Sequence, residues 1–218
     1  MIADPIRRQL DEIEIIAGRP MIITDADEVL FAFMAGLEGY LNGEGLTFDF
    51  SSFAITGNVK DADGVVLDQK AVRQHLGVFF DRHTGELDPV EHAAESLAHL
   101  SDRAQIVVLS NIPLAHREAR QDALRRHGMD YPMIANEGAK GPAVQDLFSR
   151  AAAPTIFLDD IPHNHSSVAE HADDVHRLHF VADPRLARLI PKSDHAHERV
   201  DTWPEARPII ERRLFGNG

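Results

Sequence analysis

The sequence predicts an α/β fold in which helices cover both faces of a mostly parallel sheet, giving a three-layer sandwich. Two observations predict this class. Short apolar runs are typical of strands buried in a parallel sheet, and amphipathic helical patterns separate these runs along the chain. Ligands of such folds bind beyond the carboxyl ends of the strands, so the residues that follow each run are the first candidates for a site.

The expected elements alternate in order. A short amphipathic helix is predicted over residues 6–16, where apolar residues recur at helical spacing before Gly18 and Pro20. Strands are expected over residues 20–24, 105–109, 155–158 and 175–181. The intervening helices are expected over residues 89–100, 116–127 and 142–150.

The stretch from residue 31 to residue 87 does not fit this alternation. It suggests a helix through Phe31, Phe33, Leu37 and Leu41, a hairpin formed by residues 48–56 and 65–67, and a second helix over residues 71–81. Because it lies between the first two strands of the sheet, we expect it to form a small, mainly helical cap. Residues 1–30 and 88–218 then form the core.

The composition limits the class of partner. The formal net charge of −13 argues against binding to a nucleic-acid polymer, which requires many basic residues, but it permits a small phosphorylated molecule held through a divalent cation. The chain has no cysteine, begins without a signal-peptide pattern and contains no apolar run near the ~18 residues of a membrane helix. We therefore expect a cytoplasmic protein with no membrane partner.

Asp25 and Asp27 directly follow the first apolar run. A carboxylate at a strand end is a candidate nucleophile, because its attack on phosphorus forms an aspartyl-phosphate and divides hydrolysis into two easier steps. Asp27 is placed to protonate the leaving alcohol and then to activate water. A similar pair, Asp61 and Asp63, follows polar turn residues instead of a strand and is interpreted as a solvated turn.

Acidic residues after a later strand suggest a metal site. Asp159 and Asp160 end the run over residues 155–158. Asp25, Asp159 and the main-chain carbonyl of Asp27 offer oxygen ligands suited to Mg²⁺, which would offset the repulsion between an attacking carboxylate and a phosphate dianion. Asp160 is expected to bind the ion through water or to orient Lys140.

Three further residues are candidates for binding the phosphoryl oxygens. Ser110 and Asn111 follow the run over residues 105–109, and Lys140 opens a predicted helix. The Lys140 charge is expected to screen the nucleophile and the phosphate, while the Ser110 hydroxyl and the backbone N–H groups after it donate hydrogen bonds.

Taken in their order along the chain, these four motifs (Asp25/Asp27, Ser110, Lys140 and Asp159/Asp160) resemble those of the haloacid dehalogenase-like hydrolase superfamily. The resemblance extends from residue 20 to about residue 181 and implies a Rossmann-like core. It also implies a nucleophile at Asp25, an acid/base at Asp27, a hydroxyl at Ser110, a lysine at Lys140 and metal carboxylates at Asp159 and Asp160. An aspartate at the second acidic position resembles the phosphatase branch. Glu28 departs from the pattern, which often has glycine or another small residue there.

The expected cap resembles the small helical caps of 5'(3')-deoxyribonucleotidases in its length and in the segment 77–80. This resemblance implies that Phe31, Phe33, Phe79 or Phe80 contacts a nucleobase, although core packing is the alternative for such residues. His163 follows the metal acids closely enough to touch substrate. The other histidines of the pairs 163/165 and 195/197 are interpreted as surface residues and not as zinc ligands.

The sequence therefore predicts a Mg²⁺-dependent phosphomonoesterase that acts on a small phosphorylated metabolite, with nucleotides among the candidates, as a monomer or homodimer. Two alternatives remain open. One keeps the fold but has phosphonatase, phosphomutase or dehalogenase chemistry, and the other is a binding or regulatory module with negligible turnover.

Overall fold

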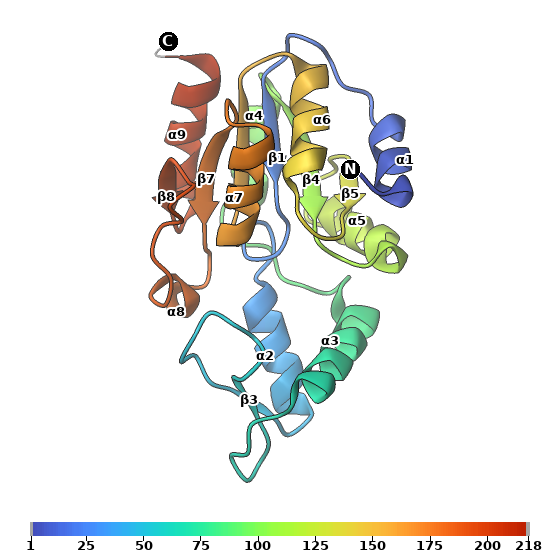
Figure 1. Ribbon diagram of the computed structural model, residues 1–218, viewed down its shortest axis with the longest axis vertical. Helices are drawn as coiled ribbons and strands as arrows, with labels where there is room; N and C mark the ends of the chain where they lie inside the picture. The colour runs from blue at the N-terminus through green and yellow to red at the C-terminus, as the bar shows by residue number, and fades with distance from the viewer. Residues whose placement is uncertain (1, 217–218) are drawn as a thin grey trace.

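The computed structural model describes residues 2–216 and confirms the three-layer α/β class. Its main sheet has six strands in the order β5-β4-β1-β6-β7-β8, and every neighbouring pair is parallel (Figure 1). The strands are β1 (Met21–Thr24), β4 (Gln105–Ser110), β5 (Met133–Ala135), β6 (Thr155–Asp159), β7 (His176–Phe180) and β8 (Glu198–Val200).

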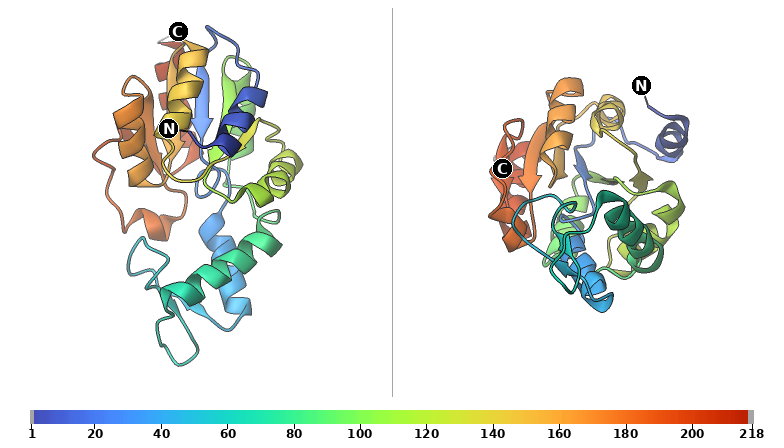
Figure 2. Two further views of the ribbon diagram at one scale, coloured as in Figure 1. Left: turned by 45° about the vertical axis from the view of Figure 1, so that its right-hand side comes forward. Right: turned by 60° about the horizontal axis from the view of Figure 1, so that its bottom comes forward.

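Helices cover both faces of this sheet (Figure 2). Side chains of α1 (Asp4–Glu12), α6 (Gly141–Ala151) and α7 (Pro162–His171) pack on one face with Met21 and Ile23 of β1. Side chains of α4 (Ala93–Ser101), α5 (Arg117–Arg126) and α9 (Trp203–Phe215) pack on the other with Ile22. Since alternate residues of a strand point to opposite faces, β1 is apolar throughout.

The register of the sheet determines where the site forms. Thr24 at the end of β1 pairs with Val108 of β4 and with Leu158 of β6. Asp25 and Asp159 therefore each lie one residue beyond a paired position at the same edge of the sheet. Their side chains meet although 134 positions (159 − 25) separate them in the sequence.

The segment over residues 31–87 lies below this edge (Figure 1). It contains α2 (Phe33–Gly43), α3 (Gln69–His83) and a small antiparallel sheet of β2 (Thr47–Phe48) and β3 (Val59–Lys60). The two helices agree with the prediction, but the expected hairpin is wrong. Residues 49–58 form a loop, which the buried Asn58 side chain stabilises by donating hydrogen bonds to the carbonyls of Ser52 (3.0 Å) and Ala54 (2.7 Å).

Other differences from the prediction have local causes. The helix expected from residue 89 begins at Ala93, after His92 takes a left-handed backbone conformation (φ 64°). The first helix ends at Glu12. The elements β5, α7, β8 and α9, together with the one-turn helix α8 (Pro184–Ala187) and the short 3₁₀ turn at Leu114–His116, were not predicted.

No helix within residues 2–216 is long and apolar enough to cross a membrane.

Close packing of α6 against α7 depends on Gly141. A Cβ atom at this position would lie 2.2 Å from the main-chain oxygen of Ser167, and the Gly141 N–H donates to Ser167 Oγ (3.0 Å). The contact matters for the site because Lys140 directly precedes Gly141.

We predict that Gly141→Ala lowers the free energy of unfolding by about 1–3 kcal/mol, since the added methyl group must push the two helices apart. Urea denaturation measures this change. The matched control is Gly39→Ala in α2, where a Cβ meets nothing within 4 Å and the substitution should stabilise the helix by about 0.5–1 kcal/mol. If the two substitutions changed the free energy of unfolding equally, close packing of α6 against α7 would not depend on Gly141.

Candidate active site

Three carboxylates form a compact cluster at the carboxyl edge of the sheet. Asp25, Asp159 and Asp160 each offer an oxygen atom within 4.8 Å of the others, and all three side chains are buried. The strands β1 and β6, which are direct neighbours, position them. An oxygen-only donor set of this kind fits a hard divalent cation such as Mg²⁺.

The Lys140 ammonium lies in the middle of this cluster. Its Nζ is 2.8 Å from Asp25 Oδ1 and 2.6 Å from Asp159 Oδ2, and its side chain is fully buried. Burial alone would lower the pKa of Lys140, but the carboxylates of Asp159 and Asp25 raise it above its usual value. The lysine therefore remains charged at neutral pH.

One lysine does not neutralise three buried acids. Burial raises the pKa of Asp25 to about 7, with Lys140 opposing and Asp159 adding to the increase. Burial, followed by the charges of Asp159 and Asp25, raises the pKa of Asp160 well above its usual value. Full ionisation of all three acids would leave an excess of negative charge beside Lys140, which a divalent cation would compensate.

Asp159 is held by contacts that the sequence analysis missed. Asn164 Nδ2 donates to both carboxylate oxygens of Asp159 (2.9 and 3.1 Å), and the N–H of Ile161 donates to Oδ1 (2.8 Å). Asn164 lies in the first turn of α7, five positions after Asp159, and that spacing was the only signal for it in the sequence.

Two buried histidines lie behind the acidic cluster. The Nε2 atoms of His165 and His179 are each 2.9 Å from a main-chain oxygen, that of Asp159 for His165 and that of Asp160 for His179. Burial lowers the pKa of His165 to about 4. The interpretation of His165 as a surface residue is therefore wrong, because α7 turns it into the core. His195 and His197 are exposed, in agreement with the prediction, and His197 Nδ1 accepts a hydrogen bond from the N–H of Arg177 (3.0 Å).

Ser110 is the last residue of β4, and Asn111 follows it at the same edge of the sheet. The Ser110 hydroxyl is fully buried, and no hydrogen-bond partner for its Oγ exists among residues 2–216. Such a group is costly unless a ligand satisfies it, so it fits a phosphoryl oxygen. The Asn111 amide instead orients the neighbouring loop, donating to the Gly138 carbonyl (2.9 Å) and accepting from Asn136 Nδ2 (2.7 Å).

The Asp27 carboxylate does not join the acidic cluster. It forms an ion pair with the fully buried guanidinium of Arg120, which also donates to Thr84 Oγ1 (3.1 and 3.3 Å) and lies over the ring of Phe31. Asp27 still lines the cavity above the cluster. Sequence analysis missed Arg120, because nothing in the polar helix α5 distinguishes it from the other arginines.

Glu28 has a left-handed backbone conformation, with φ at 58°. This conformation explains why glycine is frequent at this position in the superfamily that the motifs resemble, since glycine adopts it without strain. Here the side chain provides compensation: Oε1 accepts from the N–H of Met34 (2.7 Å) and Oε2 from that of Asp183 (2.8 Å). Burial raises the pKa of Glu28 to about 7.

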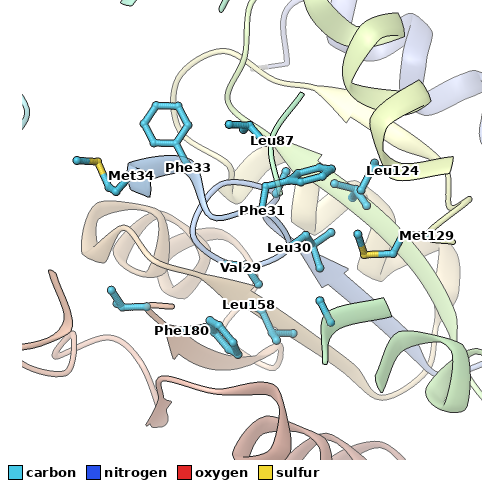
Figure 3. Close-up of a cluster of buried hydrophobic side chains, with 14 of the residues drawn as sticks. Val29, Leu30, Phe31, Phe33, Met34, Leu87, Leu124, Met129, Leu158 and Phe180 are labelled. Carbon is cyan, nitrogen blue, oxygen red and sulfur yellow. The ribbon is translucent and has the colours of Figure 1, made fainter. Parts of the chain in front are cut away.

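A cavity of about 730 Å³ lies between the acidic cluster and the segment over residues 31–87. Phe33, Phe80 and His163 line it, as does Asn111. Phe31 and Phe79 do not line it and are fully buried, which corrects two of the expected substrate contacts. Phe31 instead belongs to the hydrophobic core, where it lies near Leu124 (Figure 3).

Solved structures share this fold over most of their length. A haloacid dehalogenase family hydrolase from Deinococcus radiodurans R1, with bound phosphate and sodium, has a TM-score of 0.58 at 17% identity and covers 93% of this chain and 100% of its own. A predicted phosphoglycolate phosphatase from Lactobacillus delbrueckii subsp. bulgaricus has a TM-score of 0.57 at 14% identity, over 92% and 100% of the two chains.

A third structure, of a predicted hydrolase of the same type from Bacillus subtilis bound to magnesium, has a TM-score of 0.54 at 11% identity over 89% and 99% of the two chains. No protein-family model matches the chain, and no curated protein matches it in sequence. At these identities, the structural likeness establishes the fold.

We predict that Arg120→Met lowers the free energy of unfolding by about 2–3 kcal/mol, because it leaves the Asp27 carboxylate without its partner. Asp27 keeps some solvent contact, which places the effect below that of a fully buried pair. Adding Asp27→Asn should restore part of the loss.

Urea denaturation of the single and double variants measures these effects. Arg125→Met, which removes an exposed guanidinium from the same helix, should be much less harmful. Equal losses in the two arginine variants would show that the buried ion pair contributes nothing.

Proposed function

We propose that this chain, which has the fold of the haloacid dehalogenase-like hydrolases, is a Mg²⁺-dependent phosphomonoesterase that acts through an aspartyl-phosphate at Asp25. Its substrate would be a small phosphorylated metabolite. The observation that carries the proposal is the contact of one buried ammonium, that of Lys140, with both Asp25 and Asp159. This arrangement sets a carboxylate nucleophile beside a concentrated positive charge.

Asp25 is well oriented for attack on phosphorus. Its Oδ1 accepts hydrogen bonds from Lys140 Nζ and from the N–H of Ala26 (2.7 Å), which fixes the plane of the carboxylate at the floor of the cavity. The Lys140 charge would stabilise the nucleophile and the phosphoryl oxygens, and the Ser110 hydroxyl would donate to one of those oxygens. Attack would transfer the phosphoryl group to Asp25 and release the alcohol.

A bound Mg²⁺ held by Asp25 and Asp159, with Asp160 beside it, would supply the positive charge that a phosphate dianion needs. The magnesium of the Bacillus subtilis structure and the phosphate of the Deinococcus radiodurans structure support this expectation for a related fold.

Asp27 would act as the acid and then as the base. It lines the cavity beside Asp25, so rotation of its side chain away from Arg120 would bring the carboxyl group to the leaving oxygen. The same group would then remove a proton from the water that hydrolyses the aspartyl-phosphate. The ion pair with Arg120 fixes the position of the Asp27 side chain in the structure.

The segment over residues 31–87 would act as a cap above the core formed by residues 1–30 and 88–218. Support comes from its lining of the cavity with Phe33, Phe53, Leu76 and Phe80, opposite the acidic cluster. A cap in this place excludes water from the reacting groups and contacts the leaving group.

We predict that Asp25→Asn reduces hydrolysis of an aryl phosphate in Mg²⁺ by about a thousandfold or more, because an amide cannot form the aspartyl-phosphate. Steady-state kinetics measure the loss, and circular dichroism checks that the variant remains folded. Asp61→Asn changes the same residue type in the exposed turn with the same D-x-D spacing and should leave turnover unchanged. Full activity of Asp25→Asn would overturn the nucleophile assignment.

A second prediction concerns the residue that orients Asp159. Asn164→Ala should weaken Mg²⁺ binding by about 10–100-fold, because partners of metal ligands fix ligand orientation. Titration calorimetry measures the affinity, and Asn42→Ala at the exposed end of α2 is the control. Unchanged Mg²⁺ affinity in the Asn164 variant would argue against a metal site at Asp159.

A further inference from the structure

The walls of the cavity above the acidic cluster are mainly apolar, with neutral polar side chains at Thr56, Asn111 and Asn164 and the imidazole of His163 among them. Most of the apolar side chains come from the segment over residues 31–87 and from α8: Phe33, Met34, Phe53, Ile55, Leu76, Phe80 and Leu186. The acidic residues Asp25, Asp27, Glu28 and Asp160 lie toward the floor. Within residues 2–216, no lysine or arginine is part of the lining.

Arg120, which contacts the lining residue Asp27, and Arg185, which precedes the lining residue Leu186, already have partners. Arg120 is fully buried and paired with Asp27. Arg185 in α8 binds Asp183 (2.7 Å) and reaches Glu38 of α2 (2.6 Å), and its guanidinium lies over the ring of Phe50. Neither is placed to neutralise a second anionic group on a bound substrate.

This distribution of charge discriminates between classes of phosphate ester. The phosphate itself would sit beside Lys140 and the metal ligands at the floor. A second anionic group, a carboxylate or phosphate on the leaving group, would lose its hydration against mainly apolar walls and would face no lysine or arginine, which is strongly unfavourable. A sugar with many hydroxyl groups would also bury donors and acceptors with few partners.

We propose that the substrate carries its only charge on the phosphate and that its leaving group is uncharged and largely apolar, with an aromatic ring or a bulky hydrocarbon portion. This inference rests on the proposed phosphomonoesterase function. The rings of Phe33 and Phe80, 5.9 Å apart, provide an aromatic wall for such a group. A cavity of about 730 Å³ is of the size that holds a ring-containing molecule.

The class has clear limits. Nucleoside monophosphates meet the charge criterion and supply an aromatic base, but their sugar hydroxyl groups make them poorer candidates than aryl or hydrocarbon phosphates. Phosphoglycolate, bisphosphates and nucleoside diphosphates fall outside it, because each carries a further anionic group. The chain would therefore differ from the predicted phosphoglycolate phosphatase that shares its fold.

The test compares phenyl phosphate with 4-carboxyphenyl phosphate, which differ by one charge at the far end of the leaving group. We expect kcat/KM in Mg²⁺ to be at least about tenfold higher for phenyl phosphate, because the carboxylate would be desolvated without a partner. Phosphoglycolate should be hydrolysed more slowly still. Equal or better hydrolysis of the carboxylated ester would overturn the inference while leaving the phosphomonoesterase proposal intact.

Leu76→Lys should weaken or abolish the preference, because it places an ammonium group in the wall of the cavity. We expect the phenyl to carboxyphenyl ratio to fall by about tenfold or more in this variant. The control is Val65→Lys, which adds the same charge to the same segment at an exposed position outside the cavity. The ratio should not change in the control, and equal shifts in both variants would show that the wall does not select the substrate.

Binding of phenylphosphonate and 4-carboxyphenylphosphonate in Mg²⁺, measured by calorimetry, separates specificity from turnover. Tighter binding of phenylphosphonate, the analogue without the carboxylate, in a protein that hydrolyses neither ester would support the inference and refute the hydrolase proposal. Preference for the carboxylated analogue, or binding of neither, would overturn the inference whatever the turnover.

Discussion

The buried ammonium of Lys140 is the constraint on which the site depends. Three desolvated carboxylates at the ends of neighbouring strands repel one another, and Lys140 contacts two of them, Asp25 and Asp159. The lysine reaches this position because Gly141 allows α6 to approach α7 closely. Packing between two helices thus determines where the positive charge lies, and the charge in turn allows the acidic cluster to exist in a folded protein.

The same loop that contains the proposed nucleophile also anchors the segment over residues 31–87. Glu28 accepts hydrogen bonds from the N–H groups of Met34 and Asp183, and Arg120 connects Asp27 to Thr84 at the other end of the segment. Both chain connections to that segment are therefore fixed near the site. A left-handed backbone at Glu28 costs about 1–3 kcal/mol, and two buried hydrogen bonds offset it.

Helices and strands were predicted accurately where the hydrophobic pattern along the chain is strong and were missed where it is weak. The strands β1, β4 and β6 were predicted almost to the residue because a strand buried on both faces must be apolar throughout. Helix α7 was missed because its sequence is polar, and its buried side chains are Asn164, His165, Ser167 and Val168. The hairpin was misplaced because the hydrogen bonds of Asn58 stabilise a loop that no pattern of apolar residues marks.

The sequence by itself determined which strand ends carry Asp25, Ser110 and Asp159, because hydrophobicity locates buried parallel strands and their carboxyl ends meet at one edge of the sheet. Only the tertiary structure decided that Arg120 pairs with Asp27 and that Phe31 belongs to the core and not to the cavity. The reason is physical. Strand position depends on neighbouring residues along the chain, whereas the partner of a charged or aromatic side chain depends on distances in space between elements far apart in sequence.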